Sequence, residues 1–122
     1  MKRIEAFVQP HRLSKVVSAL HALPHFPGFT VLNAQGQGHG RGAGGSFIYS
    51  RDAGLLLHPR LVLVVDCEDH EAHDIAMTIA RTAHTGNKGD GIVTILEVSE
   101  VIRIRTAEPT SSPTAPGDGD GA

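Results

Sequence analysis

The sequence contains no tryptophan, and its aromatic residues are limited to four phenylalanines and one tyrosine among 122 residues. Proteins that bind single-stranded nucleic acid commonly stack bases on aromatic side chains, so this shortage argues against such a function. The formal net charge is only −2, which gives no general attraction to nucleic acid or to an anionic membrane surface. No apolar run approaches the roughly 20 residues of a membrane span. We therefore expect a chain that binds no nucleic acid and does not insert into a membrane.

Cysteine is also scarce, because Cys67 is the single cysteine of the chain. An internal disulfide is thus excluded, which suits a reducing compartment. The amino terminus lacks the apolar stretch of a secretory signal, so a cytoplasmic location is expected. Cys67 ends an apolar segment, and we expect it to be a small buried hydrophobic residue.

Hydrophobic periodicity predicts four strands and two helices in one domain of residues 1–108. Their order, βαββαβ, favours an α+β, ferredoxin-like fold with an antiparallel sheet covered by helices on one face. The second sheet face has no helix to cover it, so self-association is expected. The predicted strands are residues 3–9, 29–34, 60–67 and 92–98; one helix begins at Pro10 and stops at Pro24, and the other is capped by Asp66 or Asp69 and ends near Gly86.

Two segments do not follow this periodicity. Residues 35–46 contain six glycines in twelve positions, and glycine loses the most backbone entropy when it is ordered. We interpret residues 35–58 as a long, mobile and functional connection. Residues 109–122 consist largely of Pro, Gly, Ser, Thr, Asp and Ala, which cannot fill a core, and are predicted to be a disordered tail.

A glycine loop at residues 85–91, Thr-Gly-Asn-Lys-Gly-Asp-Gly, carries one cation, Lys88. Arg103 and Arg105 follow on one side of an extended segment. Backbone N–H groups and fixed guanidinium groups together suit a polyphosphate. The loop lacks the spacing and the following helix of a Walker or Rossmann motif. Taken separately, Gly-Asp-Gly is usually a turn and two arginines are usually a solvated strand face.

At these residues the chain resembles the P-II signal-transduction family. Thr85-Gly86-x-x-Gly89-Asp90-Gly91 is similar to the family's B-loop, and residues 101–106, Val-Ile-Arg-Ile-Arg-Thr, to its C-loop. Residues 1–6 and 81–86 match as well, and residues 35–58 take the place of the T-loop. The resemblance implies a homotrimer with ATP or ADP bound between subunits. It also implies a T-loop that docks on a target protein, such as a membrane transporter or an enzyme.

The resemblance further implies which residues bind the nucleotide. The backbone of the Gly89-Asp90-Gly91 turn would meet the phosphates, and the two arginines would pair with them. Thr30 matches a position near the adenine, and Gly38 and His39 lie at the root of the T-loop. The full set of implied nucleotide-binding residues is Thr30, Gly38, His39, Thr85, Gly86, Lys88, Gly89, Asp90, Gly91, Arg103 and Arg105.

Three departures from the family pattern affect this expectation. Arg60 corresponds to the lysine that the family has at the end of the T-loop. Gly40 stands where the family has the glutamine that binds Mg²⁺ and helps to hold 2-oxoglutarate, so Mg²⁺ use stays open. Ile92 stands where a lysine usually follows Gly-Asp-Gly, and losing a charge-assisted contact costs about 1.5–3 kcal/mol. Lys88 offers a partial replacement. Tyr49 cannot be equated with the family's modified tyrosine, because its surroundings differ.

The eight histidines suggest an alternative, a P-II-like regulator that responds to a metal or small anion and is linked to heavy-metal efflux. His70 and His73 lie one helical turn apart, while His39 and His58 lie near the two ends of the predicted mobile loop and flank most of it. Two ligands without a third rarely form a strong site, so a solvated helix face is the simpler reading of the first pair. No spacing typical of a catalytic triad occurs, and the chain is not expected to be an enzyme.

Overall fold

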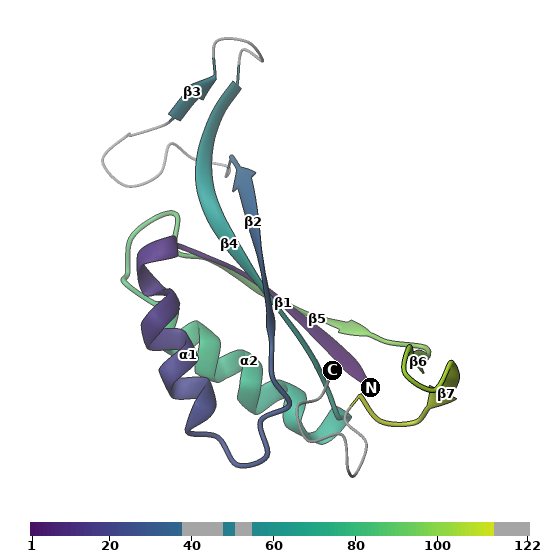
Figure 1. Ribbon diagram of the computed structural model, residues 1–122. Coiled ribbons are helices and arrows are strands. Elements are labelled where there is room, and N and C mark those ends of the chain that lie inside the picture. The colour runs from purple at the N-terminus through teal and green to yellow at the C-terminus, as the bar shows by residue number, and fades with distance from the viewer. Residues whose placement is uncertain (38–47, 51–54, 114–122) are drawn as a thin grey trace.

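The computed structural model describes residues 1–37, 48–50 and 55–113, and these form a sheet with two helices on one face (Figure 1). The fold is α+β, which confirms the predicted class, and the expected βαββαβ order is present with three short strands added. The elements are β1 (Lys2–Val8), a 3-10 turn (Pro10–Arg12), α1 (Leu13–His21), β2 (Thr30–Gly36), β3 (Ile48–Ser50), β4 (Leu55–Cys67), α2 (Asp69–Ala83), β5 (Gly91–Glu97), β6 (Val101–Arg103) and β7 (Glu108–Thr110).

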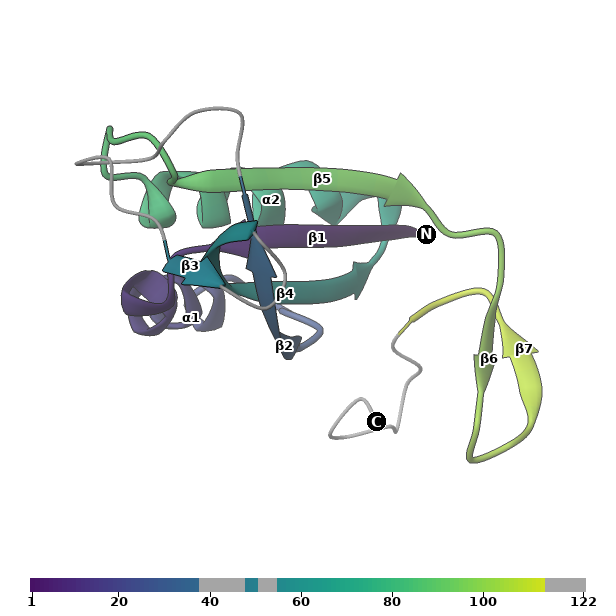
Figure 2. The same ribbon diagram turned by 90° about the horizontal axis from the view of Figure 1, so that it is seen from above.

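The main sheet has the strand order β2-β4-β1-β5, and β3 pairs separately with β4. All pairings are antiparallel, with Ile4 of β1 between Val65 and Ile95. In Figure 2 β1 lies between β4 and β5, and both helices lie behind the sheet. The central position of β1 and β4 follows from their apolar sequences, since a strand between two neighbours is the most buried.

The core lies between the helices and the sheet. Alternate residues of β1, Ile4, Ala6 and Val8, are at most 1% exposed and face the helices. The stripe predicted on the second helix is buried against them, with Ala72, Ile75, Ala76, Ile79 and Ala83 all under 9% exposed. Small alanines let this helix approach the sheet closely.

Cys67 is fully buried at the end of β4, as expected for a small hydrophobic residue. Burial raises the pKa of its thiol to about 11, and the nearby carboxylates of Glu71 and Asp66 add to this effect. The thiol is therefore protonated at neutral pH, which makes Cys67 a packing residue and not a reactive one.

The helix boundaries differ from the expectation in two respects. α2 is capped by Glu68, whose side chain accepts a hydrogen bond from the backbone N–H of Glu71. In return, the Glu71 side chain accepts a hydrogen bond of 3.1 Å from the backbone N–H of Glu68. Neither Asp66 nor Asp69 is the cap. The pair Glu68 and Glu71 is favoured because it provides acceptors for two backbone N–H groups that have no partner within the helix. α2 also ends at Ala83, and His84 is already extended before Gly86 is reached.

Parts of both segments predicted to lack structure are in strands. β2 continues to Gly36, and β4 begins at Leu55, inside the range expected for the mobile loop. At the start of the predicted tail, Glu108–Thr110 forms β7 and pairs with β6. Pro109 is compatible with a strand here because β7 is an edge of a two-stranded ribbon. Residues 38–47, 51–54 and 114–122 lie outside the described residues, so those parts of the two predictions are not addressed.

The sheet face opposite the helices carries exposed apolar side chains. The register places Leu32, Val62, Phe7 and Ile92 in one row across the four strands. Leu32 is 52% exposed and Ile92 is 63% exposed. No helix covers this row in the described part of the chain, which leaves an apolar surface available to another protein surface.

Candidate functional site

The loop between α2 and β5, residues 85–91, is closed by the Asp90 carboxylate. This group accepts hydrogen bonds from the backbone N–H groups of Thr85, at 2.8 Å, and Gly86, at 2.9 Å, and from the Thr85 hydroxyl. A carboxylate that binds two successive amides fixes the start of the loop relative to its end. The side chain of Asp90 is thus occupied within the loop, which leaves the loop's backbone and the exposed Lys88 side chain to meet a ligand.

The charge of Asp90 is maintained by these contacts. Burial of the Asp90 carboxyl favours its neutral form, but the hydrogen bonds from Thr85 and Gly86 outweigh that effect, so its pKa lies below the usual value. His84 Nδ1 lies 3.7 Å from the carboxylate and acts in the same direction when it is protonated. Asp90 is therefore ionised at neutral pH and holds the loop closed.

Two glycines of the loop are required by its geometry. Gly91 has a φ of +104°, and a Cβ at this position would lie 1.7 Å from the carbonyl oxygen of Phe7. Gly89 has a φ of +88°, and its added Cβ would lie 3.2 Å from Nη2 of Arg60. Glycine thus lets the loop join β5 directly beside β1 and lets a guanidinium group reach the loop backbone.

Two residues beside the loop were not in the set predicted from the sequence. Gln9 Nε2 donates to the carbonyl oxygen of Gly89 at 2.9 Å, and Arg60 brings a positive charge to the same turn. The backbone N–H groups of Lys88 and Gly89 donate no hydrogen bond to another described residue. The loop therefore combines available N–H donors with a nearby guanidinium, which is the chemistry of an anion site.

A hollow of about 470 Å³ lies next to the loop, between α2 and the edge strand β5. His84, Asp90 and Gly91 line it at the loop end, and the remaining lining is largely apolar, including Met77 and Val93. A mostly apolar hollow with a few polar groups at one end is the usual composition of a small-molecule site.

The two arginines lie at the other end of β5 from the loop. Residues 85–90 precede β5, whereas Arg103 ends β6 and Arg105 lies in the turn that follows it. Figure 2 shows the loop and the β6–β7 hairpin at opposite ends of β5. A seven-residue strand spans roughly 20 Å. One copy of the chain therefore does not bring the loop and the arginines together.

Arg103 contacts its own carboxyl-terminal segment in this structure. Its Nη2 donates to the carbonyl oxygens of Pro113, at 2.6 Å, and Ser112, at 3.4 Å. Sequence patterns gave no indication of this contact, because residues 109–122 were expected to be disordered.

The remaining predicted residues are distributed over the molecule. Thr30 begins β2, at the sheet edge opposite β5, and is exposed. Lys88 is exposed within the loop. Gly38 and His39 lie outside the described residues. Of the predicted nucleotide-binding set, one chain thus assembles only the loop residues 85–91.

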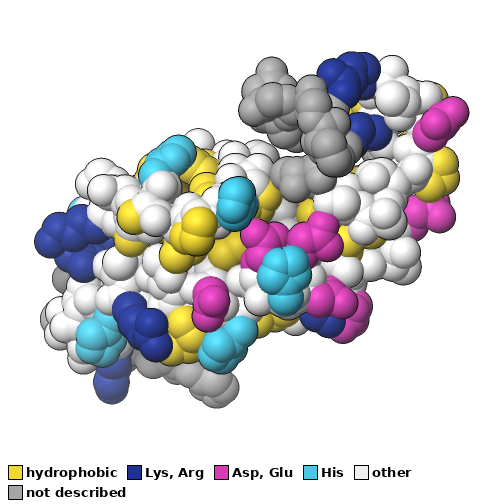
Figure 3. Space-filling view, turned by 90° about the horizontal axis from the view of Figure 1, so that it is seen from below, with side chains coloured by type: hydrophobic (Ala, Val, Ile, Leu, Met, Phe, Trp, Pro, Cys, Tyr) yellow, Lys and Arg dark blue, Asp and Glu magenta, His cyan; other side chains and the backbone are white. Residues whose placement is uncertain are grey.

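The histidine candidates do not form a metal site in the described part of the chain. Figure 3, which views the side where the helices lie, shows histidine side chains scattered around a group of acidic ones. His70 and His73 are both exposed on α2, and His58 lies in β4. Among residues 1–37, 48–50 and 55–113, no three His, Cys, Asp or Glu side chains are placed to hold a metal ion. None of the described helices is long and apolar enough to cross a membrane.

Comparison with known proteins gives one consistent result. Residues 1–108 match the family model described as nitrogen regulatory protein P-II. The chain is 38% identical over 110 residues to nitrogen regulatory protein P-II of Azospirillum brasilense, covering 88% of this chain and 95% of that protein. It is 36% identical to nitrogen regulatory protein P-II 2 of Methanothermobacter thermautotrophicus, covering 88% and 92% of the two chains. Nitrogen regulatory protein P-II 1 of Escherichia coli is also 36% identical, with 88% and 95% covered.

Proposed function

Because the chain belongs to the nitrogen regulatory protein P-II family, a family of regulatory signalling proteins, we propose that it is a trimeric sensor of adenine nucleotides. ATP or ADP binds between subunits, at the 85–91 loop of one copy and the arginines of the next. The bound nucleotide sets the shape of residues 35–58, and this segment regulates a target protein, either a membrane transporter or an enzyme. A cytoplasmic location belongs to the same proposal.

The observation that carries this proposal is that residues 85–91 and the pair Arg103 and Arg105 lie at opposite ends of β5. We call the loop and the arginine pair the two half-sites. Neither half is complete, because the loop lacks the arginine pair and the arginines lack a backbone cradle. Two copies complete one site only if the loop end of one meets the hairpin end of the other. Such a head-to-tail contact uses two different surfaces, and it closes into a ring when the rotation between copies permits.

The uncovered sheet face supports association of copies. Its exposed side chains include Leu32, Ile92 and Leu96, the last being 41% exposed. The β6–β7 hairpin adds Ile102 at 58% and Ile104 at 94%. Apolar side chains this exposed are costly in water, and burial between copies would recover about 25 cal/mol for each Å² removed from solvent.

The first test is the double variant Arg103→Ala/Arg105→Ala, studied by calorimetry with ATP and ADP. Removing two charge-assisted contacts of about 1.5–3 kcal/mol each should weaken binding by at least about 100-fold. Light scattering should still give the mass of three chains. Arg81→Ala, on the exposed surface of α2, is the matched control and should bind as the wild type does. Unchanged nucleotide affinity in the double variant would contradict the proposal.

A complementation experiment tests whether each site is shared between copies. The variant Gly89→Asp places a carboxylate in the loop and leaves the arginines intact, whereas Arg103→Ala/Arg105→Ala does the reverse. Each alone should fail to bind ATP. After random mixing of equal amounts, about one quarter of the contacts in a ring pair an intact loop with intact arginines. Recovery of about a quarter of the wild-type sites is expected, and no recovery would show that the two halves act within one chain.

The regulatory part of the proposal is tested by affinity capture of target proteins with ATP, with ADP and without nucleotide. A target whose capture changes with nucleotide in the wild type should show no such change in Arg103→Ala/Arg105→Ala. Repeating the calorimetry with excess EDTA measures the part played by Mg²⁺. A target captured equally under all conditions would contradict control by nucleotide.

A further inference from the structure

The carboxyl-terminal segment of the described chain, residues 110–113, runs from β7 back to the start of α2, and we call it the strap. Thr110 Oγ1 donates to the carbonyl oxygen of Ser112 at 3.2 Å and accepts from the Ser112 N–H at 3.3 Å. These two bonds fold the strap into a local turn. The turn orients the carbonyl oxygens of Ser112 and Pro113 toward one side chain, that of Arg103.

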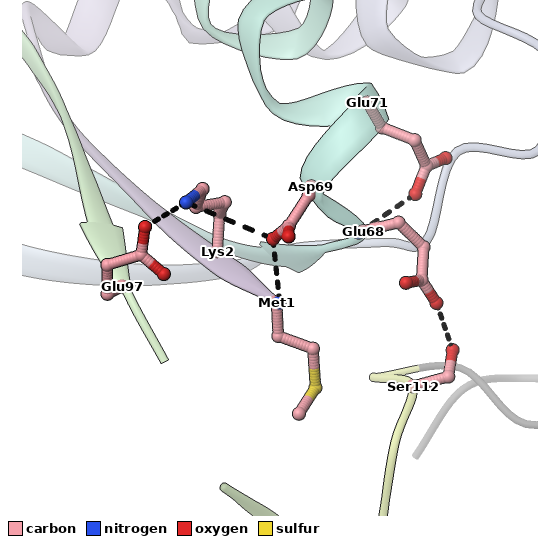
Figure 4. Close-up of polar contacts among 7 residues, drawn as sticks. All are labelled: Met1, Lys2, Glu68, Asp69, Glu71, Glu97 and Ser112. Atoms are coloured by element: carbon pink, nitrogen blue, oxygen red, sulfur yellow. Dashed lines mark hydrogen bonds and ion pairs between the residues drawn. The ribbon is translucent and has the colours of Figure 1, made fainter. Parts of the chain in front are cut away.

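The strap is attached to the body of the domain at a rigid point. The Ser112 hydroxyl donates to the carboxylate of Glu68, as Figure 4 shows. Glu68 is the cap of α2 and is itself fixed by the reciprocal bonds with Glu71. The strap therefore connects the hairpin that carries Arg103 to the helix that leads into the 85–91 loop.

The strap lies beyond the part of the chain that is similar to the family. The family model matches residues 1–108, and the strap begins two residues later. The strap residues that contact Arg103 and Glu68, Ser112 and Pro113, thus lie outside the matched residues.

We propose that the strap is a built-in competitor for the nucleotide at Arg103. The inference rests on the proposed function, in which Arg103 pairs with phosphate. Carbonyl oxygens and phosphate oxygens are both acceptors, and the Nη2 group that donates to Pro113 at 2.6 Å cannot donate fully to a phosphate at the same time. Phosphate, being charged, forms the stronger bond with a guanidinium. Nucleotide binding therefore displaces the strap, and the strap lowers the apparent affinity.

The size of the effect follows from the fraction of chains in which the strap is released. Apparent affinity falls in proportion to the fraction that is competent to bind, so a strap attached in nine chains of ten weakens binding about tenfold. Reciprocity requires that nucleotide loosen the strap by the same factor. The strap thus sets the nucleotide concentration to which the protein responds.

Two truncations measured by calorimetry with ATP test the proposal. Removing residues 111–122 deletes the strap's contacts with Arg103 and Glu68, and should tighten ATP binding by about three- to tenfold. Removing residues 114–122 keeps those contacts and should leave the affinity at the wild-type value. Equal affinities in the two truncations would overturn the proposal, as would weaker binding after removal of residues 111–122. Thermal unfolding of both truncations verifies that the domain is intact.

Point variants provide a second measurement. Ser112→Ala removes the hydrogen bond to Glu68 and should tighten ATP binding by a smaller factor, about two- to threefold. Ser111→Ala, at the neighbouring exposed serine, is the matched control and should have no effect. If Ser112→Ala binds no tighter than Ser111→Ala, the anchoring role of Glu68 is wrong.

Hydrogen exchange gives a readout at the strap itself. Addition of ATP to the wild-type protein should speed exchange in residues 108–113, and the same addition to Arg103→Ala/Arg105→Ala should not. Failure of the wild type and every variant to bind ATP would overturn the proposed function. Wild-type binding of ATP with no change in strap exchange would overturn only the competition.

Discussion

The two ends of β5 are built differently. At the loop end, residues 85–91 are fixed from within the domain by the Asp90 carboxylate, by Gln9 and by close packing on Phe7. At the other end, the β6–β7 hairpin projects from the body, and Ile104 is 94% exposed. Contacts within each copy thus hold the loop in its shape. The arginines instead lie on or beside the projecting hairpin, which the strap joins to the start of α2.

The strongest test of the preformed end is Gly91→Ala. The new Cβ would overlap the Phe7 carbonyl oxygen, 1.7 Å away, at a φ that only glycine adopts readily. The two effects together should lower the free energy of unfolding by roughly 3 kcal/mol or more. Urea unfolding measures this, with Gly28→Ala as the matched control. Gly28 has a φ of +100° with nothing within 4 Å of its added Cβ, so its cost is the backbone strain alone, about 1–2 kcal/mol. Equal losses in the two variants would mean that the loop is not tightly seated on β1.

The next largest effect is expected for Asp90→Asn. An amide keeps the shape of the side chain but loses the charge that receives the N–H groups of Thr85 and Gly86. We expect a loss of about 1 kcal/mol in unfolding free energy and faster hydrogen exchange in residues 85–91. Exchange in the hairpin should stay as it is. Asp74→Asn, on the exposed surface of α2, is the control. If the hairpin also exchanged faster, the two ends would be coupled and the contrast between them would fail.

Acid should affect the loop end through the same carboxylate. The hydrogen bonds overcome the effect of burial and hold the pKa of Asp90 below its ordinary value of 3.8 in the folded state. A lowered folded-state pKa stabilises the protein above the unfolded value, and this stabilisation is lost as the pH falls through the folded-state value. The stability difference between wild type and Asp90→Asn should therefore be full near pH 6 and shrink below about pH 4. A difference that is independent of pH would show that the charge of Asp90 is unimportant.

The smallest effect is expected at the hairpin end, where Lys2 pairs with Glu97 at the end of β5 (Figure 4). The hydrogen bond that the Lys2 ammonium donates to the Glu97 carboxylate raises the pKa of Lys2. The Lys2 side chain is 24% exposed, but Glu97 is 78% exposed, and an ion pair that is open to solvent on one side contributes little. Glu97→Gln should leave the unfolding midpoint almost unchanged, in low salt and in about 0.5 M NaCl. A clear loss would show that surface charge, in addition to the strap, fixes this end of the strand.

The sequence predicted the parts of the fold that have strong periodicity. The alternation of Ile4, Ala6 and Val8 and the alanine stripe of α2 each identify a buried face, because only one face can be apolar and covered. The start of β4 at Leu55 was not predicted, since the preceding glycines suggested a single long loop. β7 was missed because Glu108-Pro109-Thr110 has a low strand propensity and is held only by pairing with β6.

The candidate site was predicted in part. Motif spacing selected the 85–91 loop and the arginine pair, and chain order placed them before and after one predicted strand. That the extended β5 keeps the two apart in one copy is seen only in the structure. Gln9 gave no signal, because one polar residue after a strand is common. The contact of Arg103 with Pro113 depends on a turn made by Thr110 and Ser112, and such local hydrogen bonds are not visible in composition.

Under the proposed function, the opposite placement of the loop and the arginines also makes ligand stoichiometry a measure of ring closure. A closed ring of this kind would use every loop and every pair of arginines, and so would bind one nucleotide per chain. An open pair of chains has one complete site and leaves a loop and an arginine pair unused, which gives one nucleotide for two chains. Dilution that opens the ring would therefore lower the number of nucleotides bound per chain before it lowers the affinity of the sites that remain. Counting bound nucleotide against protein concentration would report the assembly state without any measurement of size.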